Sequence, residues 1–335
     1  MKEENFSFLL LTWFQENARK LPWRETKDPY HIWLSEIMLQ QTRVVAVIGY
    51  YQRFLEELPT ISALAKCEED VLLKLWQGLG YYNRARNLQK AAIEIMTNHG
   101  GVFPQAYEDI RKLSGIGDYT AGAIASTAFA LPYPAVDGNV FRVFSRIKGD
   151  NTDISTPEMK KRVSAWVREE MPPSFSGDFN QSLMELGAVV CIPNGEPLCK
   201  TCPVSKDCAC YGSEKWRELP VKPSKKPRKE EFLKVYLVEW QGKIALRKRP
   251  EKGLLAKMWE YPHYAGEIPD FFHKAEEFGR GKHLFTHITW HMTGYSLKVE
   301  DISPFPQEWH WVTAQEMAEK YPLPSAFAWV KEKNL

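Results

Sequence analysis

Apolar residues recur every three or four positions along most of the first 212 residues, which is the spacing of amphipathic helices. The pattern is strongest over residues 33–58, 71–96 and 179–191, and each run predicts a helix. Turn-forming and helix-capping residues separate the runs, as in residues 100–109 and 149–158. We therefore expect a mainly helical region over residues 1–212.

The pattern changes after residue 212. Residues 213–230 are rich in proline and lysine, a composition typical of an extended, solvated linker. Beyond them, apolar and polar residues alternate as in half-buried strands over residues 232–240, 243–249 and 283–300, and a helical stretch follows near the C-terminus. These elements predict a small α+β domain over residues 231–335.

The composition is that of an ordinary globular protein. The 335 residues carry a net charge of only +2, so any surface that binds a polyanion must be local. The first residues lack a secretory pattern, and the longest uncharged run, residues 119–136, contains serine, threonine and two prolines. We expect a cytoplasmic or nucleoid-associated monomer without a membrane-spanning segment.

Gly115 and Gly117 stand in a turn before a run of small residues. Such a turn exposes backbone N–H groups at the start of a helix, which can bind a phosphate together with the helix dipole. A tight helix–helix turn explains the same glycines equally well. One helix later, a proline-containing loop brings Asp137 to the start of another helix, where it can also be a simple N-cap.

Five of the six cysteines lie within 20 residues, which in a reducing compartment indicates metal binding rather than disulfides. Cys191, Cys199, Cys202 and Cys208 are separated by seven, two and five residues. Four thiolates can hold a tetrahedral zinc ion or a [4Fe–4S] cluster. The spacing alone does not choose between the two.

The glycine turn, the Asp137 loop and the four cysteines together resemble the helix-hairpin-helix DNA glycosylase superfamily, in its endonuclease III and MutY branch. The resemblance implies that Gly115 and Gly117 hold a DNA phosphate. It also implies that Asp137 faces the sugar of a nucleotide flipped out of the duplex, since the glycosidic bond is unreachable inside the base stack. The cysteines would hold a [4Fe–4S] cluster, with structural zinc as the alternative. The branch usually has six residues in the first cysteine interval, so this chain carries one more.

The same resemblance implies a domain organisation. A mainly α helix-hairpin-helix core would consist of a six-helix barrel over about residues 23–131 and an iron–sulfur cluster domain formed by residues 1–22 and 132–212. After the linker at 213–230, the segments "EKGLLAKMWEYP" and "HLFTHITWHMTGY" resemble a MutT/Nudix-like domain, here residues 231–335. The Nudix hydrolase signature is absent, so we expect this domain to recognise 8-oxoguanine rather than to hydrolyse pyrophosphates.

The segment "DPYHIWLSEIMLQQTRV" resembles adenine DNA glycosylases. Its Glu36 lies among apolar residues, where burial would raise its pKa and suit it to protonate adenine at N7. Asp137 would stabilise the cationic sugar, as paired carboxyl groups do in glycoside hydrolysis. Asn139 would support Asp137 and the sugar. Bifunctional relatives have a lysine where this chain has Tyr119, and tyrosine cannot form a Schiff base. The sequence therefore predicts a monofunctional glycosylase without strong lyase activity.

The resemblance also implies a set of side chains that bind the substrate. Tyr82 would be the wedge between bases, and the element Phe285, Thr286 and His287 would recognise the base opposite adenine. The remaining predicted substrate contacts are Trp23, Arg24, Leu39, Gln41, Thr42, Val44, Gln181 and Glu185.

The function predicted is removal of adenine mispaired with 8-oxoguanine or guanine in double-stranded DNA, during base excision repair. A downstream AP endonuclease would then process the product. One alternative is a related glycosylase that removes thymine opposite guanine. Another is a non-catalytic sensor of DNA lesions, which the presence of both Glu36 and Asp137 disfavours.

Overall fold

The computed structural model describes residues 5–224 and 227–334 and divides into two compact units. One unit comprises residues 1–66 and 87–224, and the other residues 67–86 and 225–335. The division at residue 224 falls inside the segment predicted as a linker, of which residues 225 and 226 lie outside the described residues. The sequence pattern gave no sign that residues 67–86 group with the C-terminal unit.

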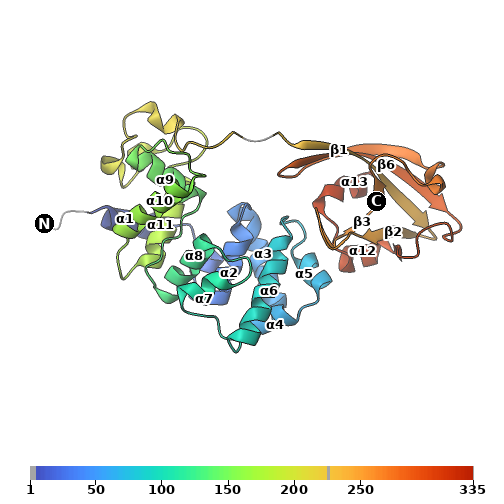
Figure 1. Cartoon of the computed structure of the whole chain (residues 1–335), viewed down its shortest axis with the longest axis horizontal. Coiled ribbons are helices and arrows are strands. Elements are labelled where there is room, and N and C mark those ends of the chain that lie inside the picture. Colours follow the sequence, from blue (N-terminus) through green and yellow to red (C-terminus); the bar gives the residue numbers. More distant parts are fainter. Residues whose placement is uncertain (1–4, 225–226, 335) are drawn as a thin grey trace. The chain divides into compact units, whose positions relative to one another are not determined.

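The first unit is helical (Figure 1). Helices α1, α9, α10 and α11 enclose one apolar core, while α2 packs against α3 and α8, and α7 packs against α8. Helix α6 begins in the second unit and continues into the first. The helices are α1 (Phe6–Asn17), α2 (Pro29–Leu39), α3 (Val44–Glu57), α4 (Ile61–Lys66), α6 (Asn83–Asn98), α7 (Tyr107–Lys112), α8 (Asp118–Phe129), α9 (Gly138–Lys148), α10 (Pro157–Glu170) and α11 (Ser176–Val189).

The small residues of α8 allow its neighbours to approach closely. A Cβ atom at Gly122 would lie 2.1 Å from the carbonyl oxygen of Pro134. A Cβ atom at Gly177 of α11 would lie 2.8 Å from the carbonyl oxygen of Ser126. The loop that leads to Asp137 and the helix α11 are therefore both held directly against the α8 backbone.

Two runs predicted as continuous helices are interrupted. The run 33–58 breaks between α2 and α3, where Gln41 has a φ of +57°. The run 71–96 breaks between α5 (Glu69–Leu75) and α6, where Tyr81 has a φ of +47°. The apolar spacing continues across both breaks, so periodicity could not reveal them. Each break leaves a side chain exposed on the surface.

The second unit is built around a seven-stranded sheet with the order β3-β2-β1-β6-β5, in which β4 also pairs with β1 and β7 with β2. Strands β1 and β6 are parallel, and the other pairs are antiparallel. The elements of this unit are α5 (Glu69–Leu75), β1 (Lys229–Trp240), β2 (Lys243–Lys248), β3 (Trp259–Glu260), β4 (His263–Tyr264), β5 (Glu276–Leu284), β6 (Ile288–Val299), β7 (His310–Val312), α12 (Ala314–Lys320) and α13 (Ala328–Asn334).

Both faces of this sheet are covered, as the alternating pattern of β1 requires. Leu233 and Val235 pack into a core that includes residues of α12 and α13. Tyr236 and Val238 enter a second core that contains Phe272. Burial of successive residues on opposite faces is the geometry that the period of two predicts.

Residues 283–300, predicted as one strand, form the end of β5, a turn and β6. The turn is closed by a hydrogen bond from the Phe285 backbone N–H to the Ile288 carbonyl at 2.8 Å, and the Lys229 N–H donates to the His287 carbonyl at 2.9 Å. The turn presents the predicted recognition element at the end of a hairpin, with Thr286 and His287 exposed.

The first part of the predicted linker is not extended and free. Residues Glu214–Arg217 form a 3-10 turn, and the Ile154 N–H donates to the Val221 carbonyl at 3.1 Å. This part of the chain therefore packs on the first unit. Across the residues the structure describes, no helix has both the length and the apolar character needed to span a membrane.

Candidate active site and cysteine pocket

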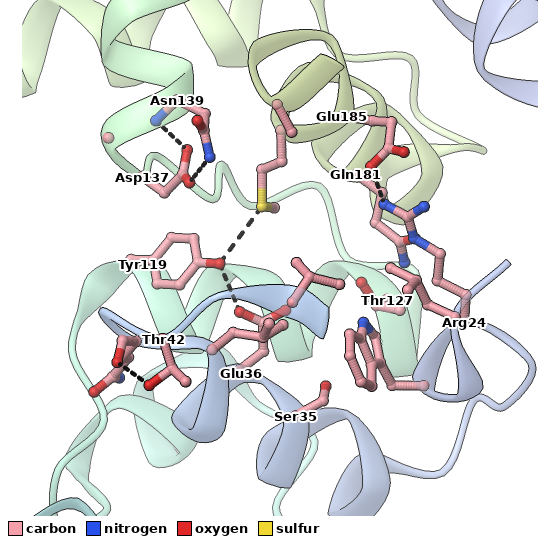
Figure 2. A pocket seen from close by; sticks show the side chains of 18 of the residues that line it. Arg24, Ser35, Glu36, Thr42, Tyr119, Thr127, Asp137, Asn139, Gln181 and Glu185 are labelled. Atoms are coloured by element: carbon pink, nitrogen blue, oxygen red, sulfur yellow. Dashed lines mark hydrogen bonds and ion pairs between the residues drawn. The ribbon is translucent and has the colours of Figure 1, made fainter. Parts of the chain in front are cut away.

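A cavity of about 590 Å³ lies in the first unit, within the size range of small-molecule sites. Figure 2 shows side chains from four helices around it: Glu36 of α2, Tyr119 of α8, Asn139 of α9 and Glu185 of α11. The structure thus brings together predicted residues that are far apart in the sequence, such as Arg24 and Glu185, which are 161 positions apart. The predicted residues that line the cavity are Trp23, Arg24, Glu36, Leu39, Gln41, Thr42, Val44, Tyr119, Asp137, Asn139, Gln181 and Glu185.

Glu36 is the acidic group of the cavity with a pKa near neutrality. The Tyr119 hydroxyl donates a hydrogen bond to its Oε2 at 2.6 Å. The pKa of Glu36 is raised from 4.5 to about 7, chiefly by burial; the Asp137 carboxylate adds to the increase, and the Tyr119 hydrogen bond and the Arg24 charge oppose it. Glu36 is therefore about half protonated at neutral pH and can donate a proton there.

Tyr119 occupies the second position of α8 and is a phenol, not an amine. Burial raises its pKa well above 10, and the carboxylates of Glu36 and Asp137 raise it further. Its hydroxyl also lies 3.5 Å from the Met184 sulfur. Tyr119 therefore stays protonated at neutral pH and acts on Glu36 as a hydrogen-bond donor.

Asp137 is the N-cap of α9. Its Oδ1 accepts hydrogen bonds from the backbone N–H groups of Asn139 at 2.9 Å and Val140 at 2.8 Å, and its Oδ2 accepts one from Asn139 Nδ2 at 2.7 Å. Burial raises the pKa of Asp137, while these hydrogen bonds and the charge of Arg142 oppose the increase. The capping role and the cavity position thus coincide in one side chain, so the N-cap interpretation and the functional one are compatible.

Glu185 is a third carboxyl group in the cavity, and its pKa is lowered rather than raised. Its side chain is fully buried, and both oxygens face arginines: Arg19 contacts Oε1 and Oε2 at 2.7 Å each, and Arg24 contacts Oε2 at 2.9 Å. Burial alone would raise its pKa, but the hydrogen bonds from Arg19 and Arg24 overcome this effect and lower the pKa to about 2. Glu185 is therefore an anion at neutral pH, whereas Glu36 is not fully ionised.

Several lining residues were not predicted from the sequence. Arg19 stands next to Lys20, and such a pair ordinarily indicates a solvated surface. Only its ion pair with Glu185, 166 positions away, identifies it as part of the cavity. The other unpredicted lining residues include Ser35, Thr127 and Met184.

One predicted DNA contact does not lie on the surface. Tyr82, predicted as the wedge between bases, is only 5% exposed, so its side chain packs inside the unit. Its neighbour Tyr81 is 48% exposed, because the positive φ at this residue turns its side chain outward. In the second unit, the Tyr81 hydroxyl lies 3.1 Å from the Thr286 hydroxyl, at the predicted recognition element.

The glycine turn joins α7 to α8. Gly115 has a φ of +78°, and a Cβ atom there would lie 2.7 Å from the Asn87 Cβ, so both conformation and space require glycine. Gly117 is the N-cap of α8, with open space beside it. Asp118 forms an ion pair with Arg111 on the exposed surface. The turn therefore leaves the N-terminus of α8 accessible.

Cys191, Cys199, Cys202 and Cys208 line one small pocket, and none of them forms a disulfide. The additional residue in the first interval lies in a loop closed by a 2.9 Å hydrogen bond from the Leu198 N–H to the Val190 carbonyl. The four cysteines still line the same pocket, and Cys210 lines it as well. Within residues 5–224 and 227–334, no three histidine, cysteine or acidic side chains form a group able to hold a single metal ion.

Arg142 connects this pocket to the cavity. Its Nε donates to the Cys191 carbonyl at 2.8 Å, and its Nη2 donates to Asn139 Oδ1 at 2.8 Å and to the Gly187 carbonyl at 2.7 Å. Asn139 in turn donates to Asp137. One buried arginine thus links Cys191 to the aspartate through a chain of three hydrogen bonds.

Comparison with known protein families agrees with both units. Residues 34–169 match the HhH-GPD superfamily of base excision DNA repair proteins, and residues 234–333 match the NUDIX domain. A solved thermostable thymine-DNA glycosylase is similar to this chain, with a TM-score of 0.57 and 30% identity, over 62% of this chain and 94% of that one. The fold and the cavity thus define a helix-hairpin-helix DNA glycosylase with a Nudix-like C-terminal domain, which confirms the predicted fold class.

Similarity to curated proteins is more specific. The adenine DNA glycosylase of Buchnera aphidicola (subsp. Acyrthosiphon pisum) is 33% identical over 315 residues, which cover 91% of this chain and 90% of the relative. That of Homo sapiens is 33% identical over 384 residues, which cover 92% and 70%. The chain belongs to the adenine DNA glycosylase family, and its enzyme class, a DNA glycosylase of base excision repair, is as predicted.

Proposed function

We propose that this enzyme hydrolyses the N-glycosidic bond of adenine mispaired with 8-oxoguanine or guanine in duplex DNA. The observation that carries the proposal is a pair of carboxyl groups in one cavity with different environments. Glu36 has a pKa of about 7, and Asp137 accepts three hydrogen bonds that favour its anionic form. Such a pair divides the work between an acid and a stabilising anion.

Glu36 protonates N7 of the flipped adenine. The C–N bond then breaks and its electron pair leaves with the neutral base. The ionised Glu36 next accepts a proton from water as the water oxygen bonds to the sugar, which restores the acid. Proton transfer of this kind contributes about 10²–10⁴-fold to the rate.

Asp137 stabilises the positive charge that develops on the sugar. Its carboxylate is fixed by Asn139 and by the start of α9, so it needs no rearrangement as the charge appears. A pre-oriented anion in a site that excludes water is among the largest contributions to catalysis. Arg142 keeps Asn139, and through it Asp137, in place.

Tyr119 limits the reaction to base removal. A phenol forms no Schiff base with the sugar, so β-elimination has no amine to start it. We propose that the product is an abasic site in an intact strand, without strong lyase activity. A separate AP endonuclease would then cut the strand, in the cytoplasm where the nucleoid lies.

The remaining lining residues select the base. Glu185 stays ionised, so it can accept a hydrogen bond from the exocyclic amino group of adenine while Arg19 and Arg24 balance its charge. Trp23 offers an apolar wall, and Gln181 adds an amide that both donates and accepts. Leu39, Gln41, Thr42 and Val44 also line the cavity and would contact the DNA where the flipped nucleotide leaves the stack.

We propose that the C-terminal unit recognises 8-oxoguanine opposite the adenine. Thr286 and His287 are exposed on the turn between β5 and β6, while Phe285 packs against Trp290 with ring centroids 4.9 Å apart. The hydrogen bond between Tyr81 and Thr286 supports Tyr81, not Tyr82, as the wedge. Gly115 and Gly117 would hold the DNA backbone through the α8 N-terminus.

We propose that Cys191, Cys199, Cys202 and Cys208 hold a [4Fe–4S] cluster. The four cysteines line one pocket, and their order along the chain resembles the cluster loop of the endonuclease III and MutY branch, which favours a cluster over zinc. When bound, the cluster would fix the loop that carries Cys191 and thereby Arg142. Absorbance near about 400 nm with stoichiometric iron would support it, whereas stoichiometric zinc would contradict it.

A single-turnover assay on duplexes with A:8-oxoG, A:G, A:C and T:G tests the function. We expect adenine release, fastest from A:8-oxoG. The thymine-DNA glycosylase relative makes removal of thymine the second candidate, and release of thymine without adenine would establish it instead. Asp137→Asn should abolish cleavage while retaining tight binding to the mispair; near-normal cleavage would refute the role of Asp137.

A further inference from the structure

Arg146 is a buried arginine whose charge is directed at a cysteine sulfur. It lies one helical turn beyond Arg142 on α9 and is only 4% exposed. Its Nη1 lies 3.4 Å from the Cys191 sulfur and donates to the Ile192 carbonyl at 3.0 Å. Its Nε donates to the Leu219 carbonyl at 3.0 Å.

The two arginines of α9 act on different parts of the same cysteine. Arg142 binds the backbone carbonyl of Cys191 and reaches toward the cavity, so it serves the active site. Arg146 binds the sulfur of Cys191, and its other partners are carbonyls on the side away from the cavity. Trp216 covers its guanidinium, 5.8 Å from the ring centroid, so water does not screen the charge.

We propose that Arg146 is a positioning residue for the cluster, which holds the Cys191 thiolate and shifts the reduction potential of the cluster upward. This inference rests on the proposed [4Fe–4S] cofactor. A hydrogen bond from a permanently charged guanidinium withdraws electron density from a thiolate. It thereby favours the more negative member of the one-electron couple, which is the form that has accepted an electron. The same bond slows release of the sulfur from iron.

A purely structural role gives a different expectation. The carbonyls of Ile192 and Leu219 belong to two segments that meet at Arg146, so the residue also ties the fold together. If Arg146 only held these two segments together, a folded variant that keeps its cluster would have an unchanged reduction potential. The potential is therefore the decisive measurement, and cluster retention is the second.

The test uses the cluster-loaded protein and the variants Arg146→Gln and Arg146→Lys. Lys148→Gln, two residues further along α9, removes the same charge from an exposed side chain that lies over the Trp166 ring and serves as the control. A hydrogen bond to a charged group contributes about 1.5 kcal/mol, which is about tenfold in an equilibrium. We expect Arg146→Gln to lower the midpoint potential by about 59 mV and to lose absorbance at about 400 nm roughly tenfold faster in a chelator. Lys148→Gln should change neither.

Arg146→Lys keeps the charge but cannot span both carbonyls and the sulfur, so its potential should lie between those of the wild type and Arg146→Gln. This variant carries the test if Arg146→Gln fails to fold. A folded variant with an unchanged potential and unchanged cluster loss would overturn the inference and leave the cofactor proposal intact. A wild-type protein that binds zinc instead would overturn both.

Discussion

Removing the Tyr119 hydroxyl isolates its effect on the catalytic acid. In Tyr119→Phe the ring remains in the cavity, but the 2.6 Å hydrogen bond to Glu36 is lost. That bond lowers the pKa of Glu36, so its loss raises the pKa above the wild-type value of about 7. A hydrogen bond to a charged group contributes about 1.5 kcal/mol, and about 1.36 kcal/mol corresponds to one pH unit. The expected increase is therefore about one pH unit.

The pH dependence of the single-turnover rate measures this shift. Only protonated Glu36 acts as the acid, so the wild-type rate constant falls with increasing pH above a midpoint of about 7, while protonation of Asp137 lowers it at acidic pH. In Tyr119→Phe the decline should begin about one pH unit higher. Tyr107→Phe, in which a hydroxyl is removed from a tyrosine outside the cavity lining, should keep the wild-type midpoint. A Tyr119→Phe midpoint at or below that of the wild type would refute the assignment of Glu36 as the acid.

Three further predictions concern the cavity, the packing beside it and the β5–β6 turn. Glu36→Gln should stabilise the protein above pH 7: the folded-state pKa of Glu36 is raised from 4.5 to about 7, so its ionisation costs the folded state up to about 3 kcal/mol as pH rises through that interval. Urea unfolding at pH 5 and pH 8 checks this prediction. If the free energy of unfolding differed between variant and wild type by the same amount at both pH values, the prediction would be contradicted. Gly187→Ala places a Cβ atom 2.6 Å from that of Asn139 and should slow cleavage at least about tenfold. Its control, Gly49→Ala, meets only an ordinary contact and should cleave normally. Thr286→Ala should reduce the preference for A:8-oxoG over A:G about tenfold, and an unchanged ratio would remove Thr286 from recognition.

The sequence located the reacting groups better than the surfaces that surround them. Glu36, Tyr119 and Asp137 each occupy a defined place in a helix or at a helix start, and such places follow from spacing, capping residues and motif. The structure then places all three in the lining of one cavity. Arg19 escaped prediction because its importance depends on a partner 166 positions away.

Backbone reversals account for the other differences. Tyr81 and Tyr82 are adjacent aromatic residues, and only the positive φ at Tyr81 decides which of them is exposed. The same limitation applies to the turn at Phe285–His287, because the alternation of apolar and polar residues there predicts a continuous strand. Periodicity reports which residues are apolar, but it does not report where the chain changes direction between them.

The close packing of α8 has a consequence for the interpretation of inherited or laboratory variants. Gly122 and Gly177 do not line the cavity, yet a backbone carbonyl occupies the place where a side chain at either position would stand. Substitution there would displace the loop before Asp137 or the helix that carries Glu185. A screen that scores repair alone would therefore class these glycines with the catalytic residues, and only a measurement of folding or of DNA binding would separate the two groups.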